Sequence, residues 1–313
     1  MTWKILISAP YFLPVVEHYR SQLETEGLEL VIADVCERLT EAELLIFAPT
    51  IHGAICGDDQ FTERVLQAAV HLKVISKWGT GIDSIDTHAA ARLGIRVCNT
   101  PDAFTDCVAD STLGYILNFA RQLFRMDHDM RNGRWIKADT VALRECTLGV
   151  IGVGNIGKAV VRRAAAFGMT VLGCDPVPVP ESFSAETGLT LVSLRELLQL
   201  SDFVTLHCDL NPTSYRLIDR SQLELMRPSA YLINTSRGAL VNEQALIEAL
   251  QSGKLAGAAL DVFESEPLPA DSPLRKLNNC LLAPHNANSG RAAKQRVHES
   301  TIRNLLTGLK QAN

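Results

Sequence analysis

The segment TLGVIGVGNIGKAVVRRAAAFG, residues 147–168, carries the strongest structural signal in this 313-residue chain. It begins as an apolar run typical of a buried strand and continues as an amphipathic helix. Between them stands the pattern G-x-G-x-x-G, formed by Gly152, Gly154 and Gly157, which predicts a dinucleotide-binding turn. Gly152 permits the tight turn, Gly154 lets a pyrophosphate approach the backbone, and Gly157 lets the helix pack closely on the strand.

The acidic residue Asp175 ends the next apolar run, eighteen positions after Gly157. A carboxylate there accepts hydrogen bonds from both adenosine ribose hydroxyls and repels a 2′-phosphate. No arginine follows it in DPVPVPES, residues 175–182. We therefore predict NAD rather than NADP, with the phosphates at the helix N-terminus. The alternative is that the glycines serve packing alone.

Short apolar runs alternate with helical segments along the whole chain, and the rhythm restarts beyond residue 146. Such alternation predicts parallel sheets covered by helices on both faces. The expected strands are 3–8, 28–33, 43–48, 73–76 and 95–99, then 147–152, 170–175, 202–207, 230–234, 256–261 and 280–284. A long helix is expected over 103–131. The two series of strands predict an α/β fold of two doubly wound parallel-sheet domains.

Bulk composition excludes several classes of protein. The net charge of −5 and the absence of a Lys/Arg cluster argue against a nucleic-acid or anionic-membrane surface. No apolar run is long enough for a membrane helix, and the N-terminus lacks a signal-peptide pattern. The eight cysteines are scattered, with neither C-x-x-C nor zinc-type spacing. We expect a cytoplasmic protein without a metal.

Three residues follow the last three expected strands: Arg237, Glu266 and His285. Each alone is typical of a surface or salt-bridge residue, and a single histidine in the polar loop APHNANSG, residues 283–290, is most often solvated. Ligands in open α/β sheets bind beyond the carboxyl ends of the strands. Together, at three strand ends of the sheet expected to bind NAD, these residues therefore predict a site.

With these motifs in view, the sequence resembles the D-isomer-specific 2-hydroxyacid dehydrogenases over essentially its whole length. That family includes phosphoglycerate dehydrogenases, glyoxylate and hydroxypyruvate reductases, and D-lactate dehydrogenases. The matching motifs are KWGTGIDSID (77–86), NTPDAFTDCVAD (99–110), GVIGVGNIGKAV (149–160), NTSRGALVNE (234–243), GAALDVFESEP (257–267) and APHNA (283–287).

The resemblance implies a Rossmann NAD-binding domain over residues 99–287. It implies a discontinuous, flavodoxin-like substrate domain made of residues 1–98 and 288–313. It also implies a homodimer formed mainly through the NAD-binding domain. The implied reaction interconverts a D-2-hydroxy acid and its 2-keto acid by hydride transfer to or from NAD.

The resemblance also assigns roles to residues. It implies that Arg237, Glu266 and His285 are the catalytic trio. It also implies that Asp261 holds the nicotinamide carboxamide. The backbone N–H groups of Trp78, Gly79, Thr80 and Gly81 are expected to hold the substrate carboxylate, together with Arg237 and His285. The full predicted cofactor set is Gly152, Gly154, Asn155, Ile156, Gly157, Asp175, His207, Thr213, Thr235, Asp261 and Val108.

These residue types suit the implied chemistry. Histidine can exchange a proton with the C2 oxygen near working pH, as acid in reduction and as base in oxidation. Glu266 would orient the imidazole and stabilise its protonated form. Arg237 offers a planar fork of donors that can hold a carboxylate and polarise the carbonyl.

The chain departs from the family at several points. The family's usual His-Ile-Gly-Gly or His-Ile-Gly-Ser is here His285 followed by Asn286, Ala287, Asn288 and Ser289. Residues 48–59 have no arginine for a substrate phosphate, and Lys77 is the only cation evident near the substrate loop, so a phosphorylated substrate is not favoured. His52 and Trp78 either line the substrate pocket or pack the domain.

Other activities are known on the scaffold that the resemblance implies. An NADH-sensing co-repressor is disfavoured because the chain lacks disordered tails. Formate dehydrogenases pair the histidine with glutamine, so Glu266 argues against them. A phosphite-type dehydrogenase keeps a similar trio and stays open.

Overall fold

The computed structural model describes residues 2–311, and the chain folds into two compact units. Residues 1–104 and 290–313 form one, here called the terminal unit, and residues 105–289 form the central unit. The domain limits expected from the sequence were 98/99 and 287/288, which lie within six residues of these boundaries.

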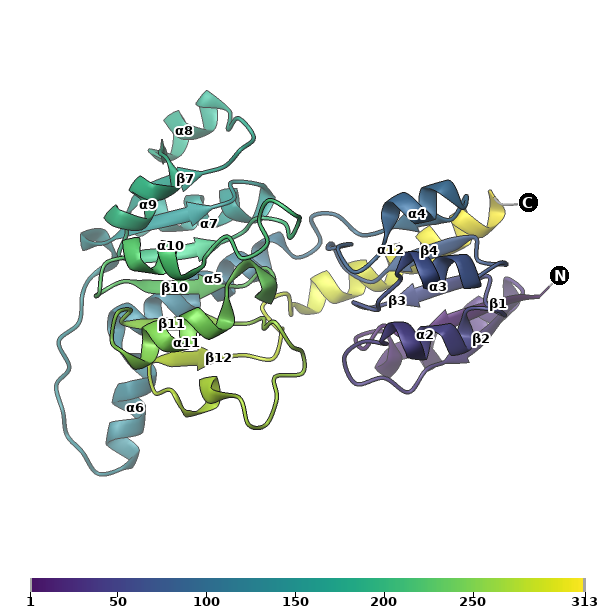
Figure 1. Cartoon of the computed structure of the whole chain (residues 1–313), viewed down its shortest axis with the longest axis horizontal. Coiled ribbons are helices and arrows are strands. Elements are labelled where there is room, and N and C mark those ends of the chain that lie inside the picture. The colour runs from purple at the N-terminus through teal and green to yellow at the C-terminus, as the bar shows by residue number, and fades with distance from the viewer. Residues whose placement is uncertain (1, 312–313) are drawn as a thin grey trace. The chain divides into compact units, whose positions relative to one another are not determined.

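The terminal unit holds a five-stranded parallel sheet within the described residues, in the order β2-β1-β3-β4-β5 (Figure 1). Its strands are β1 (Trp3–Ile7), β2 (Leu28–Ile32), β3 (Gly53–Cys56), β4 (Val74–Lys77) and β5 (Arg96–Cys98). Its helices are α1 (Val16–Thr25), α2 (Glu41–Phe47), α3 (Glu63–Ala68), α4 (Thr87–Arg92) and the C-terminal α12 (Arg291–Lys310). This strand order is that of flavodoxin-like folds, so the expected fold class is confirmed here.

One expected strand of this unit is wrong. Residues 43–48 were expected to be extended, but they lie mostly in α2, because Thr40 and Glu43 form a capping box that starts a helix. A short apolar run fits either state, and here the local cap decides. The third strand is instead β3, whose four residues are all buried.

The central unit holds a seven-stranded parallel sheet in the described part of the chain, ordered β12-β11-β10-β9-β6-β7-β8. Its strands are β6 (Thr147–Ile151), β7 (Thr170–Cys174), β8 (Thr190–Leu191), β9 (Phe203–Leu206), β10 (Tyr231–Asn234), β11 (Gly257–Leu260) and β12 (Cys280–Leu282). Its helices are α5 (Thr105–Arg121), α6 (Leu123–Arg131), α7 (Asn155–Ala166), α8 (Glu181–Thr187), α9 (Leu194–Leu200), α10 (Arg220–Leu225) and α11 (Glu243–Gln251). Short 3-10 turns are η1 (Leu13–Val15) in the terminal unit and η2 (Leu143–Glu145), η3 (Gly238–Leu240) and η4 (Pro273–Lys276) in this one.

The order of the central sheet reverses between β6 and β9, as in Rossmann folds, and so confirms the second doubly wound domain. Both faces of the sheet are covered. On β10, Leu232 joins one buried apolar cluster and its neighbour Ile233 joins the other, since successive side chains point to opposite faces. The crevice beyond β6 and β9 is therefore where a dinucleotide is expected.

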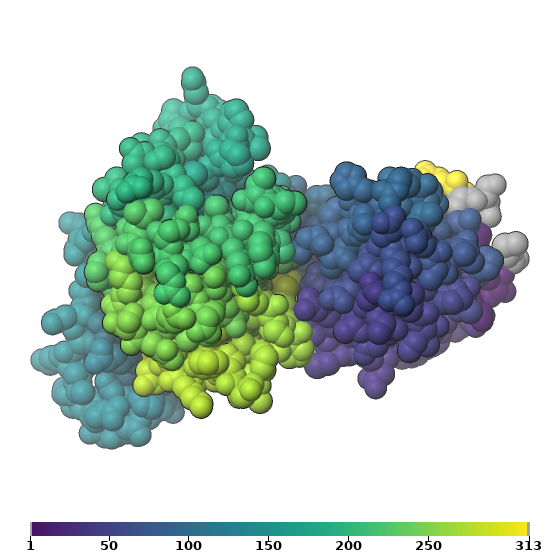
Figure 2. Space-filling model, viewed as in Figure 1, coloured from purple at the N-terminus to yellow at the C-terminus, as the bar shows by residue number. Residues whose placement is uncertain are grey.

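The expected long helix over 103–131 is two helices. Gln122 adopts a left-handed conformation with φ of 50°, which ends α5 and starts α6 in a new direction. In Figures 1 and 2, α6 and the segment after it project from the central unit. Exposed apolar side chains gather on this arm: Leu123, Phe124, Met130, Trp135, Ile136 and Val141. Among the described helices, none has the length and apolarity required to cross a bilayer.

Candidate active site

The glycine-rich turn follows β6 and is built by close packing. Gly152 has φ of 89°, and a Cβ there would lie 2.6 Å from the backbone of His207 and Cys208. A Cβ on Gly157 would lie 2.0 Å from the Gly152 carbonyl oxygen. Gly152 and Gly157 are thus required because the surrounding backbone leaves no room for a Cβ. This close packing brings the start of α7 against the end of β6.

Gly154 is different, because a Cβ there would meet no protein atom within 4 Å. It is the N-cap of the twelve-residue helix α7, and its backbone is extended, a conformation open to any residue. Asn155 and Ile156 then open the helix. A helix start with no capping side chain and no acidic residue in its first turn fits a pyrophosphate, whose oxygens would accept its N–H groups.

Asp175 lies directly after β7 and contacts the same turn. Its Oδ2 accepts the N–H of Val153 at 2.6 Å, and its Oδ1 accepts the N–H of Val177 at 2.7 Å. The carboxylate therefore ties the glycine turn to the end of β7. Each oxygen keeps a further lone pair, so the expected contact to ribose hydroxyls stays compatible with this geometry.

The other predicted cofactor residues belong to neighbouring segments. The His207 Nε2 is 3.0 Å from Thr205 Oγ1, its buried Nδ1 has no partner within the described chain, and burial lowers its pKa to about 3. His207 follows β9, where the strand order of the sheet reverses, and its neutral ring carries a buried nitrogen without a hydrogen-bond partner in the described chain. Such a nitrogen suits contact with a ligand bound there. Thr235 follows β10, Val108 lies buried on α5, and Thr213 is exposed in the loop after β9.

Glu266 and His285 are brought together within the central unit. His285 Nδ1 lies 3.0 Å from Glu266 Oε2, and both side chains are largely buried. The other oxygen of Glu266 accepts the N–H of Phe263 at 2.9 Å, which fixes the carboxylate. His285 itself adopts a left-handed backbone with φ of 48°.

The loop that carries His285 is organised by Asp261, a contact that the sequence reading missed. Asp261 is 1% exposed, and its two oxygens each accept an N–H at 2.9 Å, from Asn286 and from Ala287. Its carbonyl accepts the N–H of His285 at 2.8 Å. Burial raises the pKa of Asp261, while the two N–H groups oppose that rise.

Tyr115 of α5 completes the surroundings of Asp261. Burial, together with the nearby negative charge of the Asp261 carboxylate, raises the pKa of Tyr115 to about 12. Nearby, Ser111 Oγ donates to the Ala287 carbonyl at 3.2 Å. The departures at Asn286 and Ala287 therefore lie in a loop held by its backbone. The expected contact from Asp261 to the nicotinamide carboxamide stays a prediction.

Arg237 stands in the turn between β10 and η3. Its Nη1 donates to the Ser236 carbonyl at 2.9 Å, and its own carbonyl accepts from Asn234 Nδ2 at 2.9 Å. A Cβ on the next residue, Gly238, would lie 1.9 Å from the backbone of Phe263. This turn is therefore in backbone contact with the turn that leads to Glu266.

The predicted carboxylate loop, residues 78–81, belongs to the terminal unit and follows β4. The carbonyl of Gly79 accepts the N–H of Thr100 at 2.8 Å, and that of Thr80 accepts Asn99 Nδ2 at 2.6 Å. The N–H of Trp78 donates to the Cys56 carbonyl at 2.9 Å, so the prediction is wrong for this group. The N–H groups of residues 79–81 have no protein acceptor within residues 2–311. Fixed carbonyls and unpaired N–H groups suit a loop that binds an anion.

A matching sequence profile and related proteins extend these observations. Residues 113–287 match the family described as D-isomer specific 2-hydroxyacid dehydrogenase, NAD binding domain. A glyoxylate reductase of Korarchaeum cryptofilum is 37% identical over 298 residues, which are 93% of this chain and 87% of that protein. A D-3-phosphoglycerate dehydrogenase of Methanocaldococcus jannaschii is 38% identical over 296 residues, 93% of this chain but 55% of the longer enzyme.

A solved structure is similar over nearly the whole chain. The D-lactate dehydrogenase of Aquifex aeolicus, determined with NAD and lactic acid, gives a TM-score of 0.89 at 29% identity and covers 98% of this chain and 96% of that one. The fold and the glycine turn define an NAD-dependent oxidoreductase. Within that class, the chain belongs to the D-isomer-specific 2-hydroxyacid dehydrogenase family.

The contrast between two glycines gives a first test. In Gly154→Val the Cβ meets no protein atom within 4 Å, so we expect the free energy of unfolding to fall by only about 1 kcal/mol or less, from the N-cap preference. We expect the NADH Kd to rise about tenfold or more, a loss of about 1.4 kcal/mol in binding free energy. Gly157→Ala clashes with backbone, so we expect the free energy of unfolding to fall by about 2 kcal/mol. Fluorescence titration with NADH and urea unfolding measure the two effects. Equal NADH affinity in Gly154→Val and wild type would contradict the assignment.

Proposed function

We propose that this protein interconverts a small D-2-hydroxy acid and the corresponding 2-keto acid, with His285 and Glu266 as the acid–base pair and Arg237 as the substrate anchor. The observation that carries the proposal is the 3.0 Å contact between His285 Nδ1 and Glu266 Oε2, set beyond the strand ends of an NAD-binding sheet. Bound NAD supplies the hydride acceptor or donor, which no side chain provides.

The contact to Glu266 determines which ring nitrogen of His285 does the chemistry. A carboxylate only accepts hydrogen bonds, so the shared proton belongs to Nδ1. Nε2 is then the atom that gains or loses a proton. In reduction, Nε2–H donates to the developing C2 alkoxide; in oxidation, unprotonated Nε2 takes the hydroxyl proton. Glu266 stabilises the imidazolium in both directions.

Arg237 is the proposed anchor for the substrate carboxylate and the C2 oxygen. Its guanidinium stays protonated at any working pH and presents parallel donors to a carboxylate. The turn that carries it is fixed by the Asn234 contact and by the approach of Gly238 to Phe263. Such fixed placement supports orientation of the keto acid rather than charge attraction alone.

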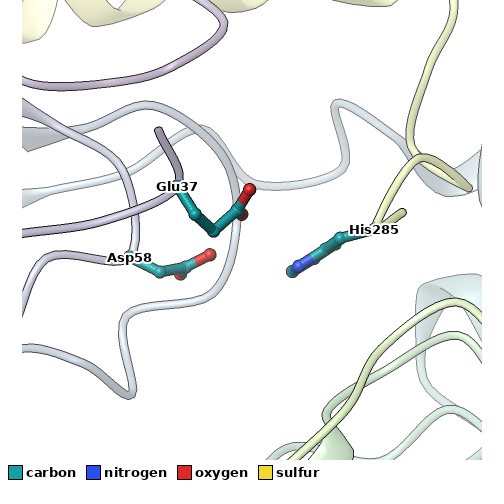
Figure 3. A group of neighbouring side chains, drawn as sticks. All are labelled: Glu37, Asp58 and His285. Carbon is teal, nitrogen blue, oxygen red and sulfur yellow. The ribbon is translucent and has the colours of Figure 1, made fainter. Parts of the chain in front are cut away.

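Charges at the carboxyl edge of the terminal sheet favour an unphosphorylated substrate. The Lys77 ammonium, whose side chain is 5% exposed, lies 3.0 Å from Asp58 Oδ1 and is neutralised there. Carboxylate oxygens of Glu37 and Asp58 lie within 4.8 Å of one another; Figure 3 shows both side chains, with His285 of the central unit also labelled. A phosphate would be repelled by these carboxylates. We therefore infer glyoxylate or hydroxypyruvate as the substrate class.

A homodimer is part of the proposal. The arm formed by α6 and residues 132–142 exposes Phe124 by 64% and Trp135 by 79%. Several large exposed apolar side chains on one segment are typical of protein interfaces. A second copy of the chain, meeting the central unit through this arm, would bury it.

Replacement of His285 tests the acid–base role. Asparagine tolerates the left-handed backbone at this position, so His285→Asn should fold normally. We expect kcat to fall by about 10²- to 10⁴-fold, as for loss of a general acid, with NADH affinity changed less than about twofold. His88→Asn, at an exposed histidine of α4, is the control. Near-normal turnover in His285→Asn would rule the role out.

A panel of 2-keto acids tests the substrate class. With NADH, we expect kcat/KM for glyoxylate or hydroxypyruvate to exceed that for 3-phosphohydroxypyruvate by at least about tenfold, because the carboxylates of Asp58 and Glu37 would repel a phosphate at the carboxyl edge of the terminal sheet. The variant Asp58→Asn removes one of these negative charges, so it should lower the ratio of kcat/KM between the unphosphorylated and the phosphorylated acid. A preference for the phosphorylated acid would overturn the inference, and no reduction of any 2-keto acid would overturn the proposed function.

The arm predicts an oligomeric state that can be measured directly. Sedimentation or light scattering should give about twice the chain mass of 34.2 kDa. The double variant Phe124→Ser, Trp135→Ser should shift the mass toward the monomer, because it removes apolar area from the contact. Phe167→Ser, at an exposed phenylalanine elsewhere in the central unit, should leave the dimer intact. A monomeric wild-type protein would contradict the arm's role.

A further inference from the structure

The C-terminal helix α12 lies along β4 in a regular register within the terminal unit. At one end, a Cβ on Gly308 would lie 2.5 Å from Val74, which marks the closest approach of the helix to the strand. Further along, Ser76 Oγ donates to the Thr301 carbonyl at 2.8 Å. Val74 and Ser76 point to the same face of the sheet, because side chains of a strand alternate.

Trp78, the first residue after β4, meets the next turn of the helix. Trp78 Nε1 donates to His298 Nδ1 at 3.0 Å, and the two side chains are only 4% and 6% exposed. Tyr11 stacks on the Trp78 ring with centroids 4.9 Å apart, and Phe104 lies against it at 5.5 Å. The indole is therefore enclosed, and its one polar atom has a single acceptor, on α12.

The hydrogen bond between Trp78 and His298 can form in one direction only, with the indole as donor. An indole N–H only donates, so His298 must present an unprotonated Nδ1. If the imidazole were protonated, both its nitrogens would be donors and the Trp78 N–H would be buried without a partner. The contact thus holds only while His298 is neutral.

We propose that His298 is a positioning residue of the substrate loop: by fixing Trp78, it holds the backbone N–H groups of residues 79–81 in place for the substrate carboxylate. This role rests on the proposed function, since it assumes that the loop binds a carboxylate. Thr100 and Asn99 fix the carbonyls of the loop from β5, and His298 fixes its first side chain from α12. Without the histidine, the indole N–H of Trp78 loses its acceptor, and the side chain is held only by ring contacts such as those to Tyr11 and Phe104.

The role implies a dependence of substrate KM on pH. Burial lowers the pKa of His298, and Lys294 on its own helix adds to this, while Glu299 opposes it. Three aromatic rings from other elements also face the His298 ring. Tyr19 of α1 is the titratable one, and its ring centroid lies 6.2 Å from that of His298. The other two, Phe12 and Trp78, carry no charge. The ring is therefore neutral at pH 7 and gains its proton only in acid, where the contact is lost.

Asparagine separates the hydrogen bond from the titration. Its Oδ1 occupies the position of the histidine Nδ1, one bond from Cγ, so His298→Asn can accept from Trp78 but does not titrate. His298→Ala removes the acceptor. Ser76→Ala removes the neighbouring hydrogen bond between β4 and α12 and serves as the control for weakened docking of the helix.

The test combines amide hydrogen exchange with steady-state kinetics on glyoxylate and NADH. In His298→Ala we expect exchange at the amides of Trp78 and Thr100, which donate to the Cys56 and Gly79 carbonyls, to rise about tenfold. We expect KM to rise by a similar factor, with kcat changed less than about twofold. His298→Asn should restore both values and remove the rise of KM that we expect for the wild type in acid, since asparagine does not titrate. Ser76→Ala should lower thermal stability but leave exchange and KM as in wild type.

Three results would overturn the proposal: unchanged exchange and KM in His298→Ala, failure of asparagine to rescue, or Ser76→Ala behaving like His298→Ala. If no variant, nor the wild type, reduces any 2-keto acid, the proposed function fails. The exchange of the Trp78 and Thr100 amides in the three variants then decides the positioning role by itself, because it needs no substrate.

Discussion

A carboxylate that is 1% exposed must find hydrogen-bond donors, and Asp261 finds them in the N–H groups of Asn286 and Ala287. Because the Asp261 carbonyl also accepts from His285, one residue at the end of β11 holds three consecutive amides of the loop after β12. This arrangement sets the left-handed turn at His285 and brings its ring to Glu266. The proposed acid–base pair therefore depends on the buried carboxylate of Asp261, which is stabilised by the N–H groups of Asn286 and Ala287.

The same constraint explains how an unusual loop sequence can be accommodated. The contacts that hold the loop use the N–H groups of Asn286 and Ala287 and the carbonyl of Ala287, so they impose little on side-chain identity there. Replacement of an aliphatic residue and a glycine thus leaves the placement of His285 intact. Glu266 is fixed in a comparable way, through the N–H of Phe263.

Much of the fold could be predicted from local patterns, and the exceptions have physical causes. The glycine turn and most strands follow from periodicity, because a buried parallel strand and an amphipathic helix leave distinct signatures. Residues 43–48 were misassigned because a capping box at Thr40 outweighs a short apolar run, and the break at Gln122 rests on a backbone angle without a sequence signal. The partners of Asp261 and the Trp78–His298 pair join residues 25 to 220 positions apart, which no local pattern reveals.

The protonation state of the His285 ring tests the central claim most directly. Nitrogen-15 NMR of histidine-labelled protein, with the signal assigned by its loss in His285→Asn, reports which ring nitrogen carries the proton. The account predicts that Nδ1 is protonated at neutral pH and that Nε2 is the nitrogen that titrates, because Glu266 accepts from Nδ1. A neutral ring protonated at Nε2, with Nδ1 titrating, would contradict it.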